Sequence, residues 1–455
     1  MPFIETRGWR LAGALAVTAA LLTPGVASAS QVPRSLAAPE AFSQDAPDCP
    51  NMPSEPITLT YWEAANEYLS EEGVATLDAE FMEAYPNVEL VRVARVFNDI
   101  IATERLQASG PNPPDILVSN GGYALLGPLV AAGLLLPLDP YAETFGWLDR
   151  FGESVLRPQR FSDDGKVYGT GSLWMLAPAA TFVGLYVHKA NLESLGLEAP
   201  ATFEAFEASL QAAKEAGLTP IAAGVQDGWP AIHMFTSFQN VVVPTEELRD
   251  IVFHTNPASF DTPENVEAAR IAQRFGSEGY YSEGYLGKTI QSAIDDFNAG
   301  QALYFLQGTY FSLPIVQALG DEAEMELIPG FEEGPFTVTG GPGLGWGISS
   351  RSPNPDAAAC YIDWRTGQRA SELFVEEGGL PAMPFDYQGD SAFTSSVFEA
   401  WSEAVERDAV VPYIDFAATN LLDVLTARSQ ELVAGQITPE QFGADIQAQY
   451  EQFEP

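Results

Sequence analysis

The feature that most constrains this chain is a regular alternation of short β-branched segments with amphipathic helical patterns. Ile57–Trp62 alternates as a half-buried strand does, and 74–85 then carries apolar residues at helical spacing until Pro86. A second strand, a second helix and a third strand at Pro114–Asn120 follow in the same manner. This order is typical of a parallel α/β sheet, which binds ligands beyond the carboxyl ends of its strands.

The alternation continues in the second half of the chain. A helix is predicted over 202–217, where Thr202 provides an N-cap and Gly217 a stop, and a strand is predicted over 219–224. Further patterns predict helices and a strand over Pro263–Gly276, Thr289–Ala299 and 302–308. No long linker separates the two halves. We therefore expect two α/β lobes between which the chain crosses more than once.

The charge of the chain excludes some partners. It has 455 residues, with 21 basic and 62 acidic side chains and a formal net charge of −41. Such a field repels nucleic acid and anionic lipid headgroups, so neither is expected as a partner. A hydrophobic content of 46% is enough for large cores.

The N-terminus has the pattern of an export signal. Arg7 and Arg10 precede an apolar run, Leu11–Val26, and "ASA" at 27–29 has the small-x-small form of a cleavage site. The run has about 16 residues, fewer than the roughly 20 that a membrane span needs. We expect a signal peptide over 1–29 without a lipoprotein cysteine, a flexible leader over 30–56, and no membrane insertion of the mature chain.

Two cysteines, Cys49 and Cys360, remain after export. An oxidising compartment allows them to form a disulfide, but the sequence leaves open whether they pair. Two cysteines and three scattered histidines are too few for a zinc site, so no metal is expected.

Motifs for catalysis are missing from the sequence. It contains no G-x-S-x-G elbow, no P-loop, no dinucleotide-binding G-x-G-x-x-G after a strand and no H-E-x-x-H. With 62 acidic residues, a pair of carboxylates at some spacing carries almost no information. We therefore expect a binding protein without a cofactor, and not an enzyme.

Aromatic residues recur where strands end or turns begin. Each lies beside glycine or a polar residue: Trp62, Trp174, Trp229, Tyr310 and Trp346. For any one of them, burial in the core is the commoner explanation. Five in the same context favour a site for a sugar, because a flat ring packs against the apolar face of a pyranose.

Polar residues lie at the same strand ends and could bind the hydroxyl groups of a sugar. They are Glu63, Asn66, Asn98, Asn120 and Asp227. The alternative for each is ordinary capping of a turn.

An ordered series of motifs resembles a known family. The motifs are "LTYW", "FMEAYPNVEL", "PDILVSNGGYALLGPLVAAGLLLPLD", "DGKVYG", "GLYVHKANLESLGL", "FNAGQALYFLQGTY" and "GWGISSRSPNPDAAACYIDW". In this order they resemble the extracellular solute-binding proteins of family 1, the carbohydrate-capturing subunits of ABC importers. The resemblance covers nearly all of 57–455.

The resemblance implies a two-lobed periplasmic binding protein fold of type II, with mainly parallel sheets. It places the N-terminal lobe in 57–172 and 348–395, and the C-terminal lobe in 173–347 and 396–455. Ligand would lie between the lobes. Hinge segments would include Gly343, at the start of the 343–346 stretch on the cleft floor.

Carried over by position, the resemblance implies platforms at Trp229 and Tyr310 on the C-terminal lobe. Glu63, Asn66 and Asn120 would offer polar groups from the other lobe, and Trp174 would lie near the first crossing. The sequence departs from the family pattern at three points. His188 stands at an asparagine and is interpreted as structural, Tyr310 replaces a tryptophan, and Asn120 replaces an aspartate.

The expected function is capture of a sugar or oligosaccharide by a soluble, monomeric periplasmic protein and its delivery to the transmembrane subunits of an ABC importer. Two alternatives stay open. One is a secreted carbohydrate-active hydrolase or lyase. The other is a binding protein for a different solute, such as a polyol or a polyamine.

Overall fold

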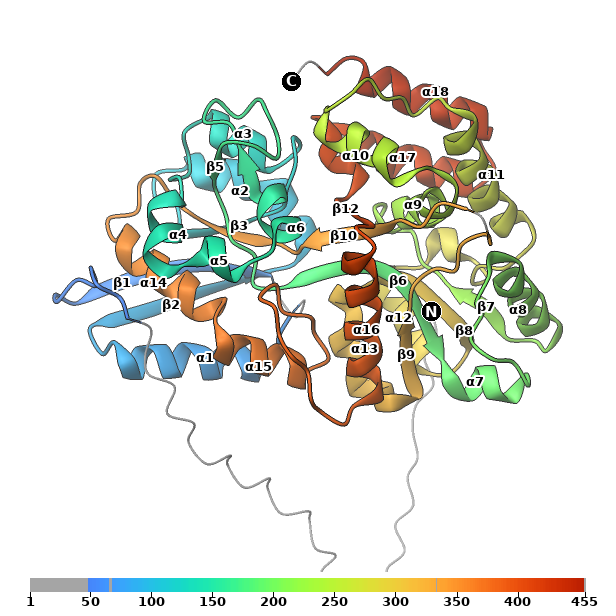
Figure 1. Cartoon of the computed structure of the whole chain (residues 1–455), viewed down its shortest axis with the longest axis horizontal. Coiled ribbons are helices and arrows are strands. Elements are labelled where there is room, and N and C mark those ends of the chain that lie inside the picture. Colours follow the sequence, from blue (N-terminus) through green and yellow to red (C-terminus); the bar gives the residue numbers. More distant parts are fainter. Residues whose placement is uncertain (1–47, 65–67, 333, 454–455) are drawn as a thin grey trace, which may run out of the picture. The chain divides into compact units, whose positions relative to one another are not determined.

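A computed structural model describes residues 48–64, 68–332 and 334–453 of the chain (Figure 1). All of them belong to one unit, Asp45–Pro455, that is compact by its internal contacts. The predicted signal peptide and most of the predicted leader lie outside the described residues.

The first sheet has four strands in the order β11-β3-β1-β2. Strands β1 (Ile57–Ala64), β2 (Val88–Arg95) and β3 (Ile116–Ser119) are parallel, and β11 (Gly345–Ile348) joins them antiparallel to β3. Helices α1 (Glu71–Ala84) and α2 (Phe97–Ser109) connect the parallel strands. The predicted order of strand, helix, strand, helix, strand is confirmed here.

Helix α1 shows how the local sequence sets these boundaries. Ser70 caps its start, because its side chain accepts a hydrogen bond from the backbone N–H of Gly73. Val74, Leu77 and Phe81 are buried on one face, at the spacing that the sequence indicated. Pro86 follows directly after the last turn, where a helix cannot continue.

The second sheet has the order β12-β10-β6-β8-β7, and β9 also pairs with β6. Its strands are β6 (Ala180–His188), β7 (Thr219–Ala222), β8 (Ala302–Gly308), β9 (Ala323–Glu326), β10 (Val338–Pro342) and β12 (Val410–Val411). Strand β6 runs antiparallel to β8, β9 and β10. The sheet is therefore mixed, and the prediction of a mainly parallel sheet is met only by the first. The reason is that β6 enters the sheet against the direction of the strands beside it.

The remaining helices cover these sheets (Figure 1). They are α3 (Leu126–Ala131), α4 (Asp139–Phe145), α5 (Trp147–Arg150), α6 (Glu153–Leu156), α7 (Lys189–Ser194), α8 (Phe203–Glu215), α9 (Pro230–Val242), α10 (Thr245–Phe253), α11 (Pro263–Ser277), α12 (Ile290–Asn298), α13 (Ser312–Leu319), α14 (Pro355–Arg365), α15 (Gln368–Glu376), α16 (Ala392–Glu406), α17 (Leu421–Val433) and α18 (Pro439–Tyr450). The shorter elements are η1 (Arg157–Gln159), β4 (Arg160–Phe161), β5 (Ser172–Leu173), η2 (Tyr285–Gly287), η3 (Thr309–Phe311), η4 (Gly320–Glu322) and η5 (Ile414–Ala417). The helix predicted after Thr202 is α8, and the Thr202 side chain caps it by accepting from the N–H of Ala205.

Three segments that connect the two sheets lie side by side. Leu176 and Trp346 exchange backbone hydrogen bonds, and the N–H of Gly343 donates to the carbonyl of Ala179 at 2.8 Å. The N–H of Ala180 donates to Leu380 at 2.9 Å, and that of Ala382 donates to Pro178 at 3.0 Å. We call 174–180, 342–346 and 380–382 the crossing segments.

Cys49 and Cys360 form a disulfide, with their Cα atoms 5.7 Å apart. This settles the pairing that the sequence left open. Cys360 lies on α14 and is fully buried, so the bond fastens the described end of the predicted leader to the first-sheet region. His188, interpreted as structural, ends β6 and packs edge-on against Phe297 at 5.8 Å between ring centroids.

Candidate functional site

A cavity of about 660 Å³ lies at the ends of the strands of both sheets, where the crossing segments meet them. From the first-sheet side it is lined by the start of α1, the start of α2 and Asn120 after β3. From the second-sheet side it is lined by α9, α12, η3, α13 and η5. Its volume is in the range of small-molecule binding sites.

Trp229 stands at the centre of an aromatic cluster in this cavity. Its indole lies nearly parallel to the ring of Phe311, at 6.2 Å between centroids, and edge-on to Tyr310 at 6.0 Å. Phe97, from the first-sheet side, also meets it edge-on at 6.0 Å. We call Phe97, Trp229, Tyr310 and Phe311 the aromatic cluster.

The local sequence explains why a tryptophan stands on this bend. Trp229 is the N-cap residue of α9 and Pro230 occupies the first turn, so the indole is carried at a rigid helix start. Gly228 precedes it with φ of +86°, and a Cβ there would lie 2.5 Å from the side chain of Thr426. Glycine therefore allows the tight turn that directs Trp229 to the cavity.

Tyr310 is held by side chains from α9 and β8. Its hydroxyl is 2.9 Å from Nε2 of His233 and also donates to Oε1 of Gln307 at 3.4 Å. Burial lowers the pKa of His233 to about 4, so the imidazole is neutral at neutral pH. The ring of Tyr310 is thus held in place by uncharged partners.

The carboxylates of the cavity differ in their partners. Glu71 is paired with Arg92, at 2.5 Å between Oε2 and Nη1. Asp227 accepts a hydrogen bond from the N–H of Ile290 at 2.7 Å and so caps the start of α12. Asp415, on η5, is 9% exposed, and burial raises its pKa to about 7.

The floor of the cavity includes a crossing segment. Gly343 lines the cavity, and a Cβ at this position would lie 2.4 Å from the hydroxyl oxygen of Tyr68. That hydroxyl accepts from the N–H of Leu344 at 2.7 Å. The close approach of Tyr68 therefore requires glycine at 343.

The structure brings together six of the eleven residues proposed from the sequence. The residues at the cavity are Asn98, Asn120, Asp227, Trp229, Tyr310 and Gly343. Asn66 lies outside the described residues. The other four, Trp62, Glu63, Trp174 and Trp346, do not line the cavity in the part of the chain that the structure describes.

Three tryptophans of that last group are buried in the core. Trp62 is 2% exposed, and the guanidinium carbon of Arg95 lies over its ring, 4.2 Å from the ring centroid. The Nε1 of Trp174 donates to the carbonyl of Phe161 at 3.0 Å, and that of Trp346 donates to the carbonyl of Trp62 at 3.1 Å. Their polar groups are satisfied inside the protein, which is the core alternative weighed for them.

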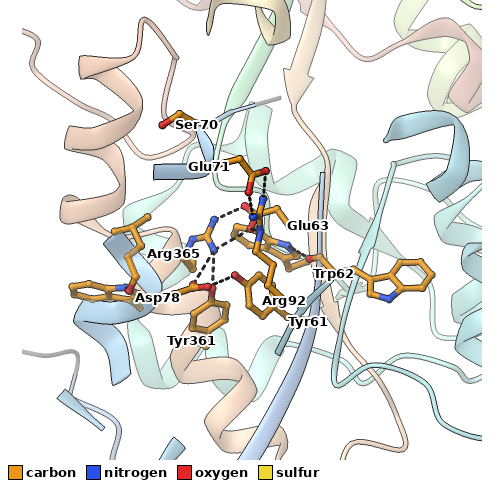
Figure 2. A network of polar contacts seen from close by, with 12 residues as sticks. Tyr61, Trp62, Glu63, Ser70, Glu71, Asp78, Arg92, Tyr361 and Arg365 are labelled. Carbon is orange, nitrogen blue, oxygen red and sulfur yellow. Dashed lines mark hydrogen bonds and ion pairs between the residues drawn. The ribbon is translucent and has the colours of Figure 1, made fainter. Parts of the chain in front are cut away.

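Glu63, on β1, lies in a buried ionic network with side chains of α1 and α14 (Figure 2). Its Oε1 is 2.5 Å from Nη2 of Arg365, which is 1% exposed, and its Oε2 is 3.1 Å from Nε of Arg92. Asp78 accepts from the hydroxyls of Tyr61 and Tyr361 at 2.5 Å each, and burial raises the pKa of Tyr61. We call Glu63, Asp78, Arg365 and the two tyrosines the Arg365 network. Both oxygens of Glu63 are engaged within the protein.

Sequence reasoning missed several residues at the cavity. Phe97 and Phe311 adjoin residues that it selected, so their aromatic character was the available signal. His233 follows Trp229 by one helical turn. Tyr413 and Asp415 lie in "VVPYIDF", a short strand followed by a turn, where no motif marked them.

Within 48–64, 68–332 and 334–453, no three His, Cys, Asp or Glu side chains are grouped as a metal site would require. Across the same residues, no helix combines the length and hydropathy of a membrane span.

The chain matches the family described as bacterial extracellular solute-binding protein over residues 63–371. This is more than half of its length, and the chain belongs to that family. The resemblance seen in the sequence is thus confirmed.

Two sequence relatives have sugar-binding names. The multiple sugar-binding protein of Streptococcus mutans is 22% identical over 208 residues, 44% of this chain and 49% of the relative. The probable sugar-binding periplasmic protein of Mesorhizobium japonicum is 35% identical over 119 residues, 26% of each chain. The chain therefore aligns with about half and about a quarter of these relatives.

Solved structures share the fold over nearly their whole length. A protein of xylan utilization from Caldanaerobius polysaccharolyticus has a TM-score of 0.76 at 22% identity, covering 86% of this chain and 99% of that one. A chitin oligosaccharide binding protein has 0.76 at 20% identity, with 87% and 98% coverage. A solute-binding protein in complex with raffinose has 0.69 at 17% identity, with 87% and 99% coverage. The fold is that of a type II periplasmic solute-binding protein.

Proposed function

We propose that this protein is the substrate-binding subunit of an ABC importer, which captures a sugar or oligosaccharide in the cavity at the crossing segments. The observation that carries the proposal is the aromatic cluster beside polar side chains in a cavity of about 660 Å³. An aromatic ring packs the C–H face of a pyranose, while amides and carboxylates bind its hydroxyl groups. The names of the sequence relatives support a sugar as the ligand.

Individual residues have distinct roles in this proposal. Trp229 and Tyr310 are the platforms on the second-sheet side, and Phe97 faces them from the first-sheet side. Asn98, Asn120 and Asp227 supply polar groups to the ligand. These are contacts that a transporter needs for recognition, and none of them calls for a chemical step.

The proposal extends to the lobes and their motion. The sequence predicts 57–172 and 348–395 for one lobe, and 173–347 and 396–455 for the other. We move the last of these boundaries to the crossing segment at 380–382, so that α16 belongs with the second sheet. Ligand that contacts both lobes stabilises the state in which they are close, and the membrane subunits of the importer recognise that state. The crossing segments are the hinge.

The cellular context is also part of the proposal. Residues 1–29 direct export and are removed, and the mature monomer is periplasmic. It returns its sugar unchanged, so it is a receptor and not an enzyme.

One observation favours a second candidate. The residues that the structure places around the cavity include three carboxylates and no lysine or arginine. Aromatic rings with carboxylates also suit an organic cation such as a polyamine. The ligand screen must therefore distinguish a sugar receptor from a polyamine receptor.

The test is a thermal-shift screen of the purified protein against mono- and oligosaccharides, polyols and polyamines. A ligand at 100 times its Kd adds about 2.7 kcal/mol of stability, which is readily detected. A shift with one class of sugar, with the sugar recovered intact, supports the proposal. A shift with spermidine alone would replace sugar by amine as the ligand, and consumption of the sugar would overturn the receptor assignment.

A further inference from the structure

Asp415 differs from the two other carboxylates at the cavity. Glu71 has Arg92 as its partner and Asp227 caps α12, so both are engaged within the protein. Asp415 is 91% buried, and no cation of the described residues lies within ion-pair distance of it. Its carboxyl group accepts a hydrogen bond from its own backbone N–H, and no side chain of the described residues is found hydrogen-bonded to it. Part of its acceptor capacity is therefore not used by the described protein.

The elements packed against η5 do not supply a counter-charge to Asp415. On α10, Arg249 is paired with Glu246 and Asp408. On α17, Arg428 is paired with Glu431 and Asp445. The remaining titratable or charged groups on α10, on α17 and in the neighbouring segments are Glu247, Asp250, His254, Tyr123, Tyr168, Tyr413, Asp423 and Arg157. Arg157 lies over the ring of Phe253, 3.8 Å from its centroid, and makes no ion pair with Asp415 among the described residues.

Apart from Arg157, these remaining groups are either acidic or neutral at pH 7. His254 is bonded through Nε2 to the carbonyl of Ala417, and burial lowers its pKa. The hydroxyl of Tyr168 donates to Pro158 at 2.9 Å. The raised pKa of Asp415 follows from this setting, because burial disfavours a charge that no ion pair offsets, and its effect outweighs that of the hydrogen bond from the backbone N–H of Asp415 itself.

Burial alone does not make such a carboxyl a binding residue. Glu104 on α2 is 3% exposed and burial raises its pKa to about 8, but it lies beside Ser119 and does not line the cavity. Asp415 combines burial with a place on the cavity wall. This combination distinguishes it.

We infer that Asp415 sets the charge selectivity of the cavity: it accepts hydrogen bonds from hydroxyl or ammonium groups of the ligand and excludes ligands that carry a carboxylate or a phosphate. The inference rests on the proposed function, which it deepens by restricting the sugars to neutral and amino sugars. An anionic group in the cavity would meet three carboxylates without a lysine or arginine among the described lining residues. A hydroxyl or ammonium donor would instead offset the burial of Asp415.

The substitution Asp415→Asn tests this with little change of shape. It keeps one carbonyl acceptor and removes the negative charge. Because hydrogen bonds to charged groups are the stronger ones, we expect the Kd for the neutral sugar to rise about ten- to a hundredfold. Asp149→Asn, an exposed change on α5, is the matched control and should bind as the wild type does.

The probes are the sugar found in the thermal-shift screen and its own acid, made by oxidising a primary hydroxyl or, where it has none, the anomeric carbon. Calorimetry at pH 6 and pH 8 measures both. The wild type should bind the neutral sugar at least tenfold more tightly than the acid, with a wider gap at pH 8, where Asp415 is ionised in the free protein. Asp415→Asn should narrow the difference in affinity between the sugar and its acid, and more at pH 8 than at pH 6.

The outcomes separate this inference from the proposed function. Equal affinity of the wild type for the sugar and its acid would overturn the inference and leave the sugar receptor intact, as would unchanged binding by Asp415→Asn. A screen that finds only an anionic solute would overturn both. A neutral or cationic solute that is not a sugar would overturn the proposed function, and the same variant would then be tested with that solute. If the variant does not fold, the wild type alone tests the inference, through the change from pH 6 to pH 8 in its relative affinity for the sugar and the acid.

Discussion

Two buried carboxylates of this protein have opposite surroundings. Glu63, 5% exposed, contacts the guanidinium groups of Arg365 and Arg92 (Figure 2). Asp415, 9% exposed, lies at the cavity, and no cation of the described residues is within ion-pair distance of it. Glu63 lies near the end of β1, and Asp415 lies on η5, a few residues after β12. Both are acidic, but only Glu63 is paired with cations within the fold.

The difference shows how a buried charge can be assigned a role. Removing a carboxylate from water is costly unless a counter-charge, a proton or a bound ligand offsets the cost. At Glu63 the counter-charge is part of the chain, so the residue stabilises the fold. At Asp415, a bound proton offsets the cost of burial in the free protein. We propose that a hydrogen-bond donor of the ligand offsets it in the complex.

The largest expected effect comes from breaking the Arg365 network. Arg365→Met leaves Glu63 and Asp78 buried without their main cation, so the free energy of unfolding should fall by about 3–5 kcal/mol. Urea unfolding followed by circular dichroism measures this. A loss below about 1 kcal/mol would show that solvent reaches Glu63 and that the contrast with Asp415 is false.

The pH dependence of stability probes the other carboxylate. The pKa of Asp415 is about 7 in the folded protein, whereas an unfolded aspartate has about 4. Between these values the folded state holds a proton that the unfolded state has released. Its contribution to stability is therefore full below about pH 4 and is lost as the pH rises towards 7 and beyond.

Asp415→Asn removes this titration. Relative to the wild type, the variant should gain stability between pH 4.5 and pH 8, on the order of a few kcal/mol. Urea unfolding of both proteins across this range measures the difference, in which the titration of all other groups cancels. The control Asp149→Asn should have a stability profile against pH that runs parallel to that of the wild type. If the profile of Asp415→Asn is also parallel to it, Asp415 is already ionised in the folded protein across this range.

Trp229→Ala tests the aromatic cluster, with an effect on binding and little effect on the fold. We expect ligand binding to weaken by about 2 kcal/mol, because the main stacking surface is lost. Calorimetry measures the affinity, and Trp229→Phe should retain part of it. A large drop in the Tm of the free protein would instead make Trp229 a core residue like Trp346.

The smallest effect on stability is expected at an ion pair on the surface. Like the Arg365 network it joins an arginine to a glutamate, but it is not buried. Arg407 and Glu403 are about half exposed and one helical turn apart on and after α16, at 2.8 Å. Glu403→Gln should change the free energy of unfolding by less than about 1 kcal/mol. A loss as large as that of Arg365→Met would mean that burial is not what separates these ion pairs.

Much of the first sheet could be predicted because its information is local. In β1, α1 and β2 the spacing of apolar residues, the Ser70 cap and the stop at Pro86 all lie within a few residues of the element that they define. The second sheet depends on pairings such as Leu185 with Leu306 and Gly340 with Phe182, which join residues more than 100 positions apart. Its mixed direction was therefore not visible in the sequence.

The site shows the same limit. Trp229 was found because a large ring on a turn is unusual in sequence alone. Glu63 was proposed for its place at a strand end, but its partner Arg365 comes 302 residues later. No motif in the sequence around Asp415 indicated a binding role, because only the folded chain brings η5 to the cavity.

The crossing segments have a mechanical consequence. They are joined by main-chain hydrogen bonds between Leu176 and Trp346, Ala179 and Gly343, and Ala180 and Leu380. Sliding one segment by a single residue would break every one of these bonds, whereas twisting the ribbon keeps them formed. A joint of this kind is stiff to shear and soft to torsion. The stiffness of this joint therefore comes from backbone hydrogen bonds and depends little on the side chains of the crossing segments.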